Sequence, residues 1–300
     1  MKKIFIVAAV LSAPLFINGR DCKGGTCCPS QKTCNPVQKI ATESCNTASN
    51  NNKVETKEII QQAYSTVVKE SGFVCEGGGC CGGGSDLSQQ IGYTQQELEM
   101  FADANLGLGC GHPVSLGYIK EGDIVIDLGS GAGLDCFLAA CKVGRTGKVI
   151  GVDMTQEMIN KARANAQKYT MSNVEFRLGD IEALPVDSNS VDVIMSNCVI
   201  NLAPNKKQVF KEAHRVLKSG GKMAVSDVVL LNQLTDAQRK DPKLLCACVS
   251  GAVLKEDYLG MLQQVGFEVT IIDEDKDINK KWFGNDELPI SSLKFIAYKK

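Results

Sequence analysis

The sequence predicts an α/β fold in which a largely parallel sheet carries helices on both faces. Three observations lead to this prediction. From Asp123 onward, short apolar runs alternate with amphipathic segments of helical period, the order typical of strand–helix–strand units. The first apolar run ends in the glycine-rich turn "DLGSGAG", residues 127–133, and the second ends in a carboxylate, Asp153. Glycine turns and carboxylates at strand ends are typical of sheets that bind nucleotides.

Strands are predicted where apolar residues follow one another or alternate with polar ones, as in "VIDL" and "VDVIM". Nearly continuous apolar runs suit strands of a parallel sheet, which is covered on both faces. The predicted strands span residues 123–130, 147–154, 174–180, 191–197, 221–230, 267–273 and 291–300.

Helices are predicted where apolar residues recur every three or four positions, as in "KEIIQQAYSTVVKE". Thr94, with Glu97 three residues later, predicts a capped helix start. Thr155 is predicted to cap another helix, and Gly220 is predicted to end the one that begins near Asn205. The predicted helices span residues 57–70, 94–105, 133–144, 155–169, 205–220 and 255–266.

The N-terminal part of the chain differs from the rest. Residues 1–20 combine a basic end with an apolar run that is too short to cross a bilayer, so they are predicted to be a signal peptide or a membrane anchor. Residues 21–56 are polar and are predicted to form a tail or linker. Residues 57–300 are predicted to be one domain, with a core at 123–231 between the parts 57–122 and 232–300. The tail holds five cysteines: Cys22, Cys27, Cys28, Cys34 and Cys45.

Charge and cysteine content narrow the class of function. The net charge is −1, so no basic footprint points to nucleic acid or to an anionic membrane, and the predicted partner is a small molecule. The chain has 14 cysteines and only 2 histidines. Disulfide frameworks stabilise small domains that lack a core, which this chain does not need, so we favour free thiols. Low histidine content disfavours mixed Cys/His zinc sites and leaves all-cysteine metal sites open.

The turn after the first strand predicts a nucleotide-type cofactor. Gly129, Gly131 and Gly133 allow the backbone to approach a ligand closely, and Asp153 follows at the spacing expected for a carboxylate that binds ribose hydroxyls. Both S-adenosylmethionine and NAD fit these features. The sixth position of the dinucleotide fingerprint is not glycine, which suits S-adenosylmethionine because it has no pyrophosphate. Asp180, after the third strand, is placed to meet an adenine amino group.

Three cysteines lie in loops or at strand ends, where α/β proteins bind ligands. Cys198 follows the strand 191–197 within "SNCVINL", and the polar Ser196 and Asn197 beside it argue against a purely packing role. Cys110 lies in "LGLGCGHP" and Cys248 in "CACVSGAV", next to the extra thiol of Cys246. By contrast, the thiols on the helix after the glycine turn are predicted to be inert packing. These are Cys136 and Cys141.

Four stretches carry a resemblance to a known family: "VIDLGSGAGLDCFLAA", "GKVIGVDMTQEMINKARANA", "VEFRLGDIEALPVDSNSVDVIMSNCVINL" and "RVLKSGGKMAVSDVV". They resemble the class I S-adenosylmethionine-dependent methyltransferases, and among them the arsenite methyltransferases. "GVDMT" and "SNCVINL" are more specific than the glycine turn. The resemblance covers about residues 57–300 and implies a Rossmann-like, seven-stranded sheet whose last hairpin is antiparallel, with substrate-binding insertions.

The resemblance also implies roles for individual residues. Cys110, Cys198 and Cys248 correspond to the family's arsenic ligands and catalytic thiols. Cys80 and Cys81 match a vicinal pair near the family's N-terminal substrate loop, and we expect them to capture arsenite; Cys75 is left unassigned. The residues expected to bind S-adenosylmethionine are Asp127, Gly129, Gly131, Gly133, Asp153, Met154, Asp180, Ile181 and Asn197.

The implied reaction is methyl transfer to trivalent arsenic for arsenic detoxification. Three thiolates would hold arsenic in a pyramid and leave its lone pair free to attack the sulfonium methyl. Methylation formally oxidises arsenic, so two thiols are expected to return two electrons by forming a disulfide, which thioredoxin or glutathione would reduce. Cys80 with Cys110, or Cys110 with Cys198, are the pairs considered. Reduced thiols and S-adenosylmethionine favour a cytoplasmic location, with membrane contact only if residues 1–20 act as an anchor.

Two other functions remain open from the residues alone. One is methylation of an organic small molecule, such as a quinone or sterol, on the same fold; it would tolerate loss of the three cysteines. The other is sequestration of soft metals without catalysis, which would tolerate loss of Asp153. His112 and His214 have no partner pattern for acid–base catalysis and are predicted to orient a neighbour or to pack.

Overall fold

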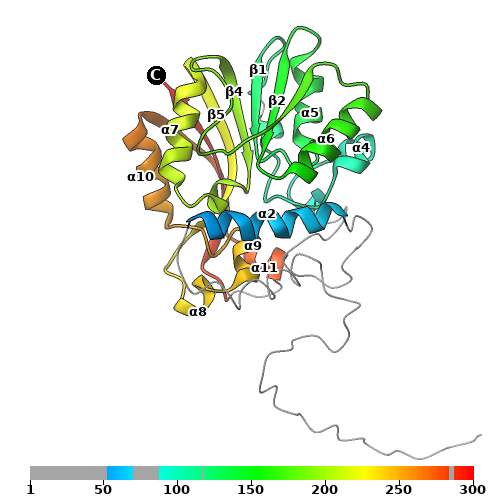
Figure 1. The fold of residues 1–300 in the computed structure, drawn as a ribbon. Helices are drawn as coiled ribbons and strands as arrows, with labels where there is room; N and C mark the ends of the chain where they lie inside the picture. Colours follow the sequence, from blue (N-terminus) through cyan, green and yellow to red (C-terminus); the bar gives the residue numbers. More distant parts are fainter. Residues whose placement is uncertain (1–52, 70–87, 117, 284–286) are drawn as a thin grey trace, which may run out of the picture.

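The protein is built around one seven-stranded sheet in the order β3-β2-β1-β4-β5-β7-β6, which confirms the predicted α/β fold (Figure 1). This computed structural model describes residues 53–69, 88–116, 118–283 and 287–300. The predicted leader, the five tail cysteines, and Cys75, Cys80 and Cys81 lie outside these residues. The strands are β1 Ile124–Leu128, β2 Lys148–Asp153, β3 Val174–Leu178, β4 Val191–Asn197, β5 Leu217–Leu230, β6 Phe267–Asp275 and β7 Ile290–Lys299.

Strand direction follows the expected pattern. β3, β2, β1, β4 and β5 pair in parallel, whereas β7 is antiparallel to both β5 and β6. The last strand therefore inserts between β5 and β6 and forms the antiparallel hairpin with β6. Because the parallel strands share one direction, their carboxyl ends meet along one edge of the sheet, where ligands bind in folds of this type.

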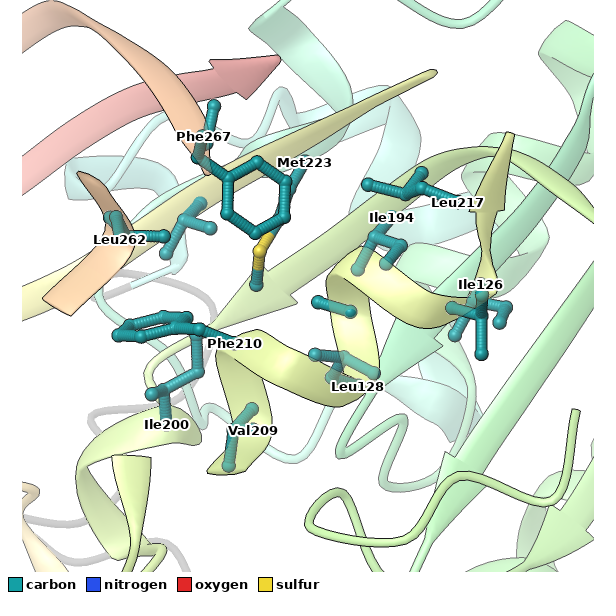
Figure 2. Close-up of a cluster of buried hydrophobic side chains, with 14 of the residues drawn as sticks. Ile126, Leu128, Ile194, Ile200, Val209, Phe210, Leu217, Met223, Leu262 and Phe267 are labelled. Carbon is teal, nitrogen blue, oxygen red and sulfur yellow. The ribbon is translucent and has the colours of Figure 1, made fainter. Parts of the chain in front are cut away.

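Helices cover both faces of the sheet, and side chains alternate between the two layers. Along β1, Val125 packs with α5 and α6 on one face, while Ile126 and Leu128 pack with α7 and α10 on the other. Figure 2 shows part of this second layer, with Leu262 of α10 and Phe210 of α7 toward one side of the cluster and Ile126 and Leu128 of β1 toward the other. The helices are α2 Lys53–Lys69, α4 Gln95–Met100, α5 Leu134–Val143, α6 Gln156–Lys168, α7 Lys206–Val216, α8 Asp236–Arg239, α9 Pro242–Cys246, α10 Lys255–Val265 and α11 Ile278–Phe283, with 3-10 turns η1 Ala102–Ala104, η2 Pro113–Leu116 and η3 Ile200–Leu202.

Helix α2 crosses the carboxyl ends of the strands (Figure 1). Gln61 Nε2 donates to the Met154 carbonyl oxygen, 2.9 Å away, just after β2, and Ser65 Oγ donates to Glu157 of α6 at 2.9 Å. Within α2, the side chain of Ile60 is buried. The helix begins at Lys53, inside the part that we predicted to be tail, and it covers the edge where ligands bind.

Three local predictions differ from the structure. The helix predicted to end at Gly220 ends at Val216, because Leu217 is extended, buried and paired with Val191 as the first residue of β5. The helix predicted over 94–105 is one short helix followed by η1, although the capping box of Thr94 and Glu97 is present. Thr155 occupies the N-cap of α6 but makes no side-chain cap.

Within the described residues, no helix combines the length and apolar character needed to cross a membrane.

Candidate active site

A cavity of about 310 Å³ opens at the carboxyl ends of β1, β2 and β4, under α2. It is lined by the glycine turn, by the segments after β2, β3 and β4, and by residues of α2 and α9. Of the residues expected to bind the cofactor, those that line it are Asp127, Gly129, Gly131, Asp153, Met154, Asp180, Ile181 and Asn197.

Gly133 is the expected cofactor residue that does not line the cavity. It is the N-cap of α5, and a Cβ there would approach Phe176 and Phe137 to 2.7 and 2.9 Å. The absence of a side chain at this position therefore serves the packing of α5 on the sheet.

The carboxylate of Asp153 is fixed by backbone donors at the end of β2. Gly131 N donates to Oδ2 at 3.0 Å and Thr155 N donates to Oδ1 at 2.8 Å. Burial nevertheless raises the pKa of this carboxyl group. Each carboxylate oxygen keeps a further lone pair, so the group can accept hydrogen bonds from two ribose hydroxyls.

Asp180 lies at the same edge of the cavity, bound to α2. Lys57 Nζ donates to its Oδ2 at 2.6 Å and to Glu182 Oε2 at 2.9 Å. Glu182 N donates to Asp180 Oδ1 at 2.8 Å. The ion pairs connect the outer helix to the segment expected to surround an adenine.

Three thiols from distant segments meet beside this cavity. Cys110 precedes η2, Cys198 follows β4 and Cys248 follows α9, and all three are buried. Cys198 lies next to both other cysteines: its Sγ is within 4.8 Å of Cys110 Sγ, and its carbonyl oxygen accepts a hydrogen bond from Cys248 Sγ. Cys198 and Cys248 also line the cavity. Of the three cysteines that the resemblance marked as arsenic ligands, the structure thus brings the thiols of Cys110 and Cys198 together and places the Cys248 thiol against the Cys198 backbone.

Backbone carbonyl oxygens accept hydrogen bonds from two of the three thiols. Cys110 Sγ donates to the Ser226 carbonyl oxygen at 3.2 Å, and Cys248 Sγ donates to the Cys198 carbonyl oxygen at 2.7 Å. Cys198 and Cys248 have φ angles of +58° and +61°, in the left-handed region that non-glycine residues seldom adopt. Such backbone strain persists where surrounding contacts over-determine it and often marks functional sites.

The pKa values of Cys110 and Cys198 are raised, which favours their protonated forms. Burial raises the pKa of Cys110. The hydrogen bond with Cys110, then that with Cys248, and burial hold the pKa of Cys198 well above its ordinary value. From the sequence we expected thiolates, whereas the raised pKa values of Cys110 and Cys198 favour thiols, whose protons a soft ion can replace.

A buried carboxylate, Asp227 of β5, completes the cluster. One of its oxygens and the Sγ atoms of Cys110 and Cys198 all lie within 4.8 Å of one another. Asn201 Nδ2 donates to Oδ1 at 2.9 Å and Tyr258 OH donates to Oδ2 at 3.0 Å. Burial raises the pKa of Asp227 to about 7. Sequence reasoning missed this residue, although a charged side chain within the apolar strand "MAVSDVVL" is a signal for it.

The remaining thiols have simpler settings. Cys246 lines the cavity and packs against Ala63 of α2. Cys136 is buried and donates to Asp127 Oδ2 at 3.3 Å, in line with the predicted packing role. The same prediction is wrong for Cys141, which is exposed.

Both histidines pack against aromatic rings. The ring of His112 stacks on Tyr93 with centroids 4.2 Å apart, and the ring of His214 meets Phe267 edge-on at 5.3 Å.

Comparisons with known proteins agree with this fold. A family model described as a methyltransferase domain matches residues 119–266. The structure of phosphoethanolamine N-methyltransferase 2 from Haemonchus contortus shares the fold, with a TM-score of 0.55 at 16% identity over 72% of this chain and 59% of that one. Together, the sheet order and the cavity at the carboxyl ends of its strands define a class I methyltransferase.

More similar relatives identify the family within this class. The chain is 45% identical over 249 residues to arsenite methyltransferase from Halobacterium salinarum and 34% identical over 223 residues to that from Homo sapiens. These alignments cover 78% and 71% of this chain but 63% and 58% of the relatives, so the chain spans less than two thirds of their length. The crystal structure of an arsenic(III) S-adenosylmethionine methyltransferase from Chlamydomonas reinhardtii matches with a TM-score of 0.57 at 32% identity, over 71% of this chain and 73% of that one. The chain belongs to the arsenite methyltransferase family.

Proposed function

We propose that this protein transfers a methyl group from S-adenosylmethionine to trivalent arsenic bound by Cys110, Cys198 and Cys248. One observation carries the proposal: buried cysteines from three segments far apart in the chain lie next to one another beside the cofactor cavity, which Cys198 and Cys248 line. Family membership supports the same reaction.

The cavity suits a positively charged nucleoside. Burial raises the pKa of Asp127, Asp135 and Asp153, which line it. Buried carboxylates are costly unless a cation or hydrogen-bond donors compensate them. S-adenosylmethionine carries an ammonium and a sulfonium group, and when bound it supplies an activated methyl group. We assign ribose binding to Asp153, and contacts with the positively charged end of the cofactor to Asp127 and Asp135.

The thiol cluster suits arsenite better than zinc. Three sulfur ligands match the preference of trivalent arsenic, whereas zinc in a structural site takes four ligands and offers no lone pair for alkylation. Thiols also suit arsenite, since each thiol proton leaves with one arsenic hydroxyl group as water. No external base is needed for this exchange.

Cys198 determines where bound arsenic lies relative to the cofactor. It lines the cofactor cavity and lies beside both other cysteines, so arsenic bound to all three sulfurs would adjoin the cofactor. Holding reactants in near-attack geometry lowers a barrier by about 7–11 kcal/mol at best. Positioning is therefore the main contribution that we assign to the protein.

We also propose a route for the electrons. Methyl transfer raises arsenic formally from the trivalent to the pentavalent state, and oxidation of two thiolates to one disulfide returns two electrons to it. Of the pairs considered above, Cys110 and Cys198 lie within the described residues and close together. Thioredoxin or glutathione in the cytoplasm would then reduce the disulfide. A single turnover without added thiol should leave this disulfide in peptide maps, and its absence would exclude this route.

The function is tested by incubating the purified protein with arsenite, labelled S-adenosylmethionine and glutathione, and separating the arsenic species. We expect labelled methylarsenicals from the wild type and from Cys141→Ser, whose thiol is exposed on α5. We expect at least about a hundredfold loss of rate in Cys198→Ala, because an oriented ligand is removed.

The same assay separates the alternatives. Asp153→Ala should abolish methylation while arsenite binding persists, which distinguishes an enzyme from a protein that only sequesters metal. Methylation of a quinone or sterol that is unaffected by Cys198→Ala, with no methylated arsenic, would refute the proposal in favour of an organic substrate.

A further inference from the structure

Asn197, the last residue of β4, connects the cofactor cavity to the loop that carries Cys110. Its Oδ1 accepts hydrogen bonds from Cys110 N at 2.9 Å and Gly111 N at 3.2 Å. Its Nδ2 donates to the Gly111 carbonyl oxygen at 2.7 Å. One amide therefore binds three backbone groups of this loop, and Cys198 is the next residue along the chain.

A second set of contacts orients the amide from the opposite side. Tyr93 OH donates to Asp135 Oδ1 at 2.8 Å, and Asn197 Nδ2 donates to the Tyr93 oxygen at 3.0 Å and to Asp135 Oδ2 at 3.3 Å. An amide has two N–H groups and an oxygen with two lone pairs. All of them are engaged within the protein, so Asn197 lines the cavity with no polar capacity left for the cofactor that the sequence analysis assigned to it.

Neighbouring side chains pack closely against the loop that carries Cys110. A Cβ on Gly109 would lie 2.7 Å from Asn197 Nδ2, and one on Gly111 would lie 2.5 Å from Ser226 Oγ. Ser292 Oγ donates to the Cys110 carbonyl oxygen at 3.0 Å, so both backbone polar groups of Cys110 are bound by side chains. Cys110 cannot shift toward or away from Cys198 without breaking these contacts.

We propose that Asn197 is a positioning residue that acts through Cys110: it fixes the third sulfur of the arsenic site. The inference rests on the proposed function. Without the amide, two buried backbone N–H groups lose their acceptor, and the loop must move to satisfy them. The Cys198–Cys248 pair does not depend on Asn197, because Cys248 Sγ donates directly to the Cys198 carbonyl oxygen.

Because Asn197 positions Cys110 but not the Cys198–Cys248 pair, we expect Asn197→Ala to change the affinities for two arsenicals differently. Arsenite has three exchangeable positions and needs all three thiols, whereas phenylarsine oxide has one arsenic–carbon bond and needs only two. In the full-length Asn197→Ala protein, we expect arsenite affinity to fall at least about tenfold and phenylarsine oxide affinity to stay within about threefold of wild type. Asn173→Ala is the matched control, because Asn173 Nδ2 also donates to two backbone carbonyls, those of Ala140 and Gly144, away from the cavity.

A double-mutant cycle tests whether Asn197 works through Cys110. In a Cys110→Ala background, adding Asn197→Ala should change arsenite affinity by less than about twofold, because the third sulfur is already absent. Tyr93→Phe is a milder second variant, which keeps the ring stacked on His112 and removes only the hydroxyl group. It should weaken arsenite binding by about threefold and leave phenylarsine oxide binding unchanged.

Three outcomes would overturn the inference. They are arsenite binding by Asn197→Ala as tight as in wild type, equal weakening of both arsenicals, and a full effect of Asn197→Ala in the Cys110→Ala background. If Asn197→Ala does not fold, an unselective effect of Tyr93→Phe on both arsenicals overturns it instead. The proposed function is tested separately: it fails if the wild-type protein neither binds nor methylates arsenite.

Discussion

At the scale of single residues, burial decides the chemistry of this site. Burial raises the pKa values of the Cys110 thiol and the Asp227 carboxyl group, and the neighbouring Cys110 and Cys248, together with burial, raise that of Cys198. These shifts favour protonated groups, whose protons a soft ion can replace.

Exposure predicts the order in which the cysteines react. With iodoacetamide at pH 7.5, we expect Cys141, which is exposed, to be alkylated at least about tenfold faster than Cys110 and Cys198. The measurement is peptide-resolved mass spectrometry over time. Equal rates for the three residues would show that the cluster holds accessible thiolates, contrary to this account.

Asp227 predicts a pH dependence of stability. Its pKa in the fold is about 7, above the ordinary value of 3.8, so its favourable contribution is complete below about pH 4 and is lost as the pH rises toward 7. The free energy of unfolding of wild type relative to Asp227→Asn should fall by about 4 kcal/mol between pH 4 and pH 8. Denaturant unfolding of both proteins across this range gives the difference. A difference that is constant or increases with pH contradicts the assignment.

Sequence reasoning found the residues whose roles follow from strand ends. Asp153 and Cys198 were placed at the carboxyl ends of predicted strands, and the structure has them there. Cys110 was singled out for its loop setting, and its role as an arsenic ligand came from the resemblance. The roles of Tyr93 and Asp135 depend on contact with Asn197 across 104 and 62 positions of the chain, and no local pattern carries that information.

At the scale of elements, long segments with a clear period were predictable and short ones were not. Helices such as α6 and α10 show an apolar face over three turns. α8, α9 and α11 have only four to six residues, too few to show a period, yet α9 leads directly to Cys248. The elements that complete the thiol site are thus the ones least visible in the sequence.

The turn between β1 and α5 predicts a contrast between two glycines. A Cβ on Gly129 would lie 2.4 Å from Val199 Cγ2, whereas one on Gly131 would meet only Met158 Sδ at 4.0 Å. Both have positive φ, at a cost of about 1–2 kcal/mol for alanine.

We therefore expect Gly129→Ala to lower stability clearly more than Gly131→Ala, while Gly131→Ala mainly weakens cofactor binding at the cavity wall. Urea unfolding and titration calorimetry with S-adenosylmethionine measure the two effects. If Gly131→Ala destabilises the protein as much as Gly129→Ala, steric contact with Val199 is not the deciding factor.

At the scale of the whole molecule, the sheet brings distant segments to one edge. Cys110 comes from the segment before β1, Cys198 from the end of β4 and Cys248 from the segment between β5 and α10. Helix α2 covers the cofactor cavity beside them and connects to the ends of β2 and β3. The cofactor cavity and the thiol site are therefore adjacent, and the consecutive residues Asn197 and Cys198 lie between them.

The central claim is that these three sulfurs together bind one arsenic atom. X-ray absorption at the arsenic edge, on the full-length protein with one equivalent of arsenite, measures the sulfur coordination directly. The account predicts three sulfur neighbours in the wild type and in Cys141→Ser, and fewer in a protein that lacks Cys110, Cys198 and Cys248. The same sulfur coordination in that triple variant would contradict it.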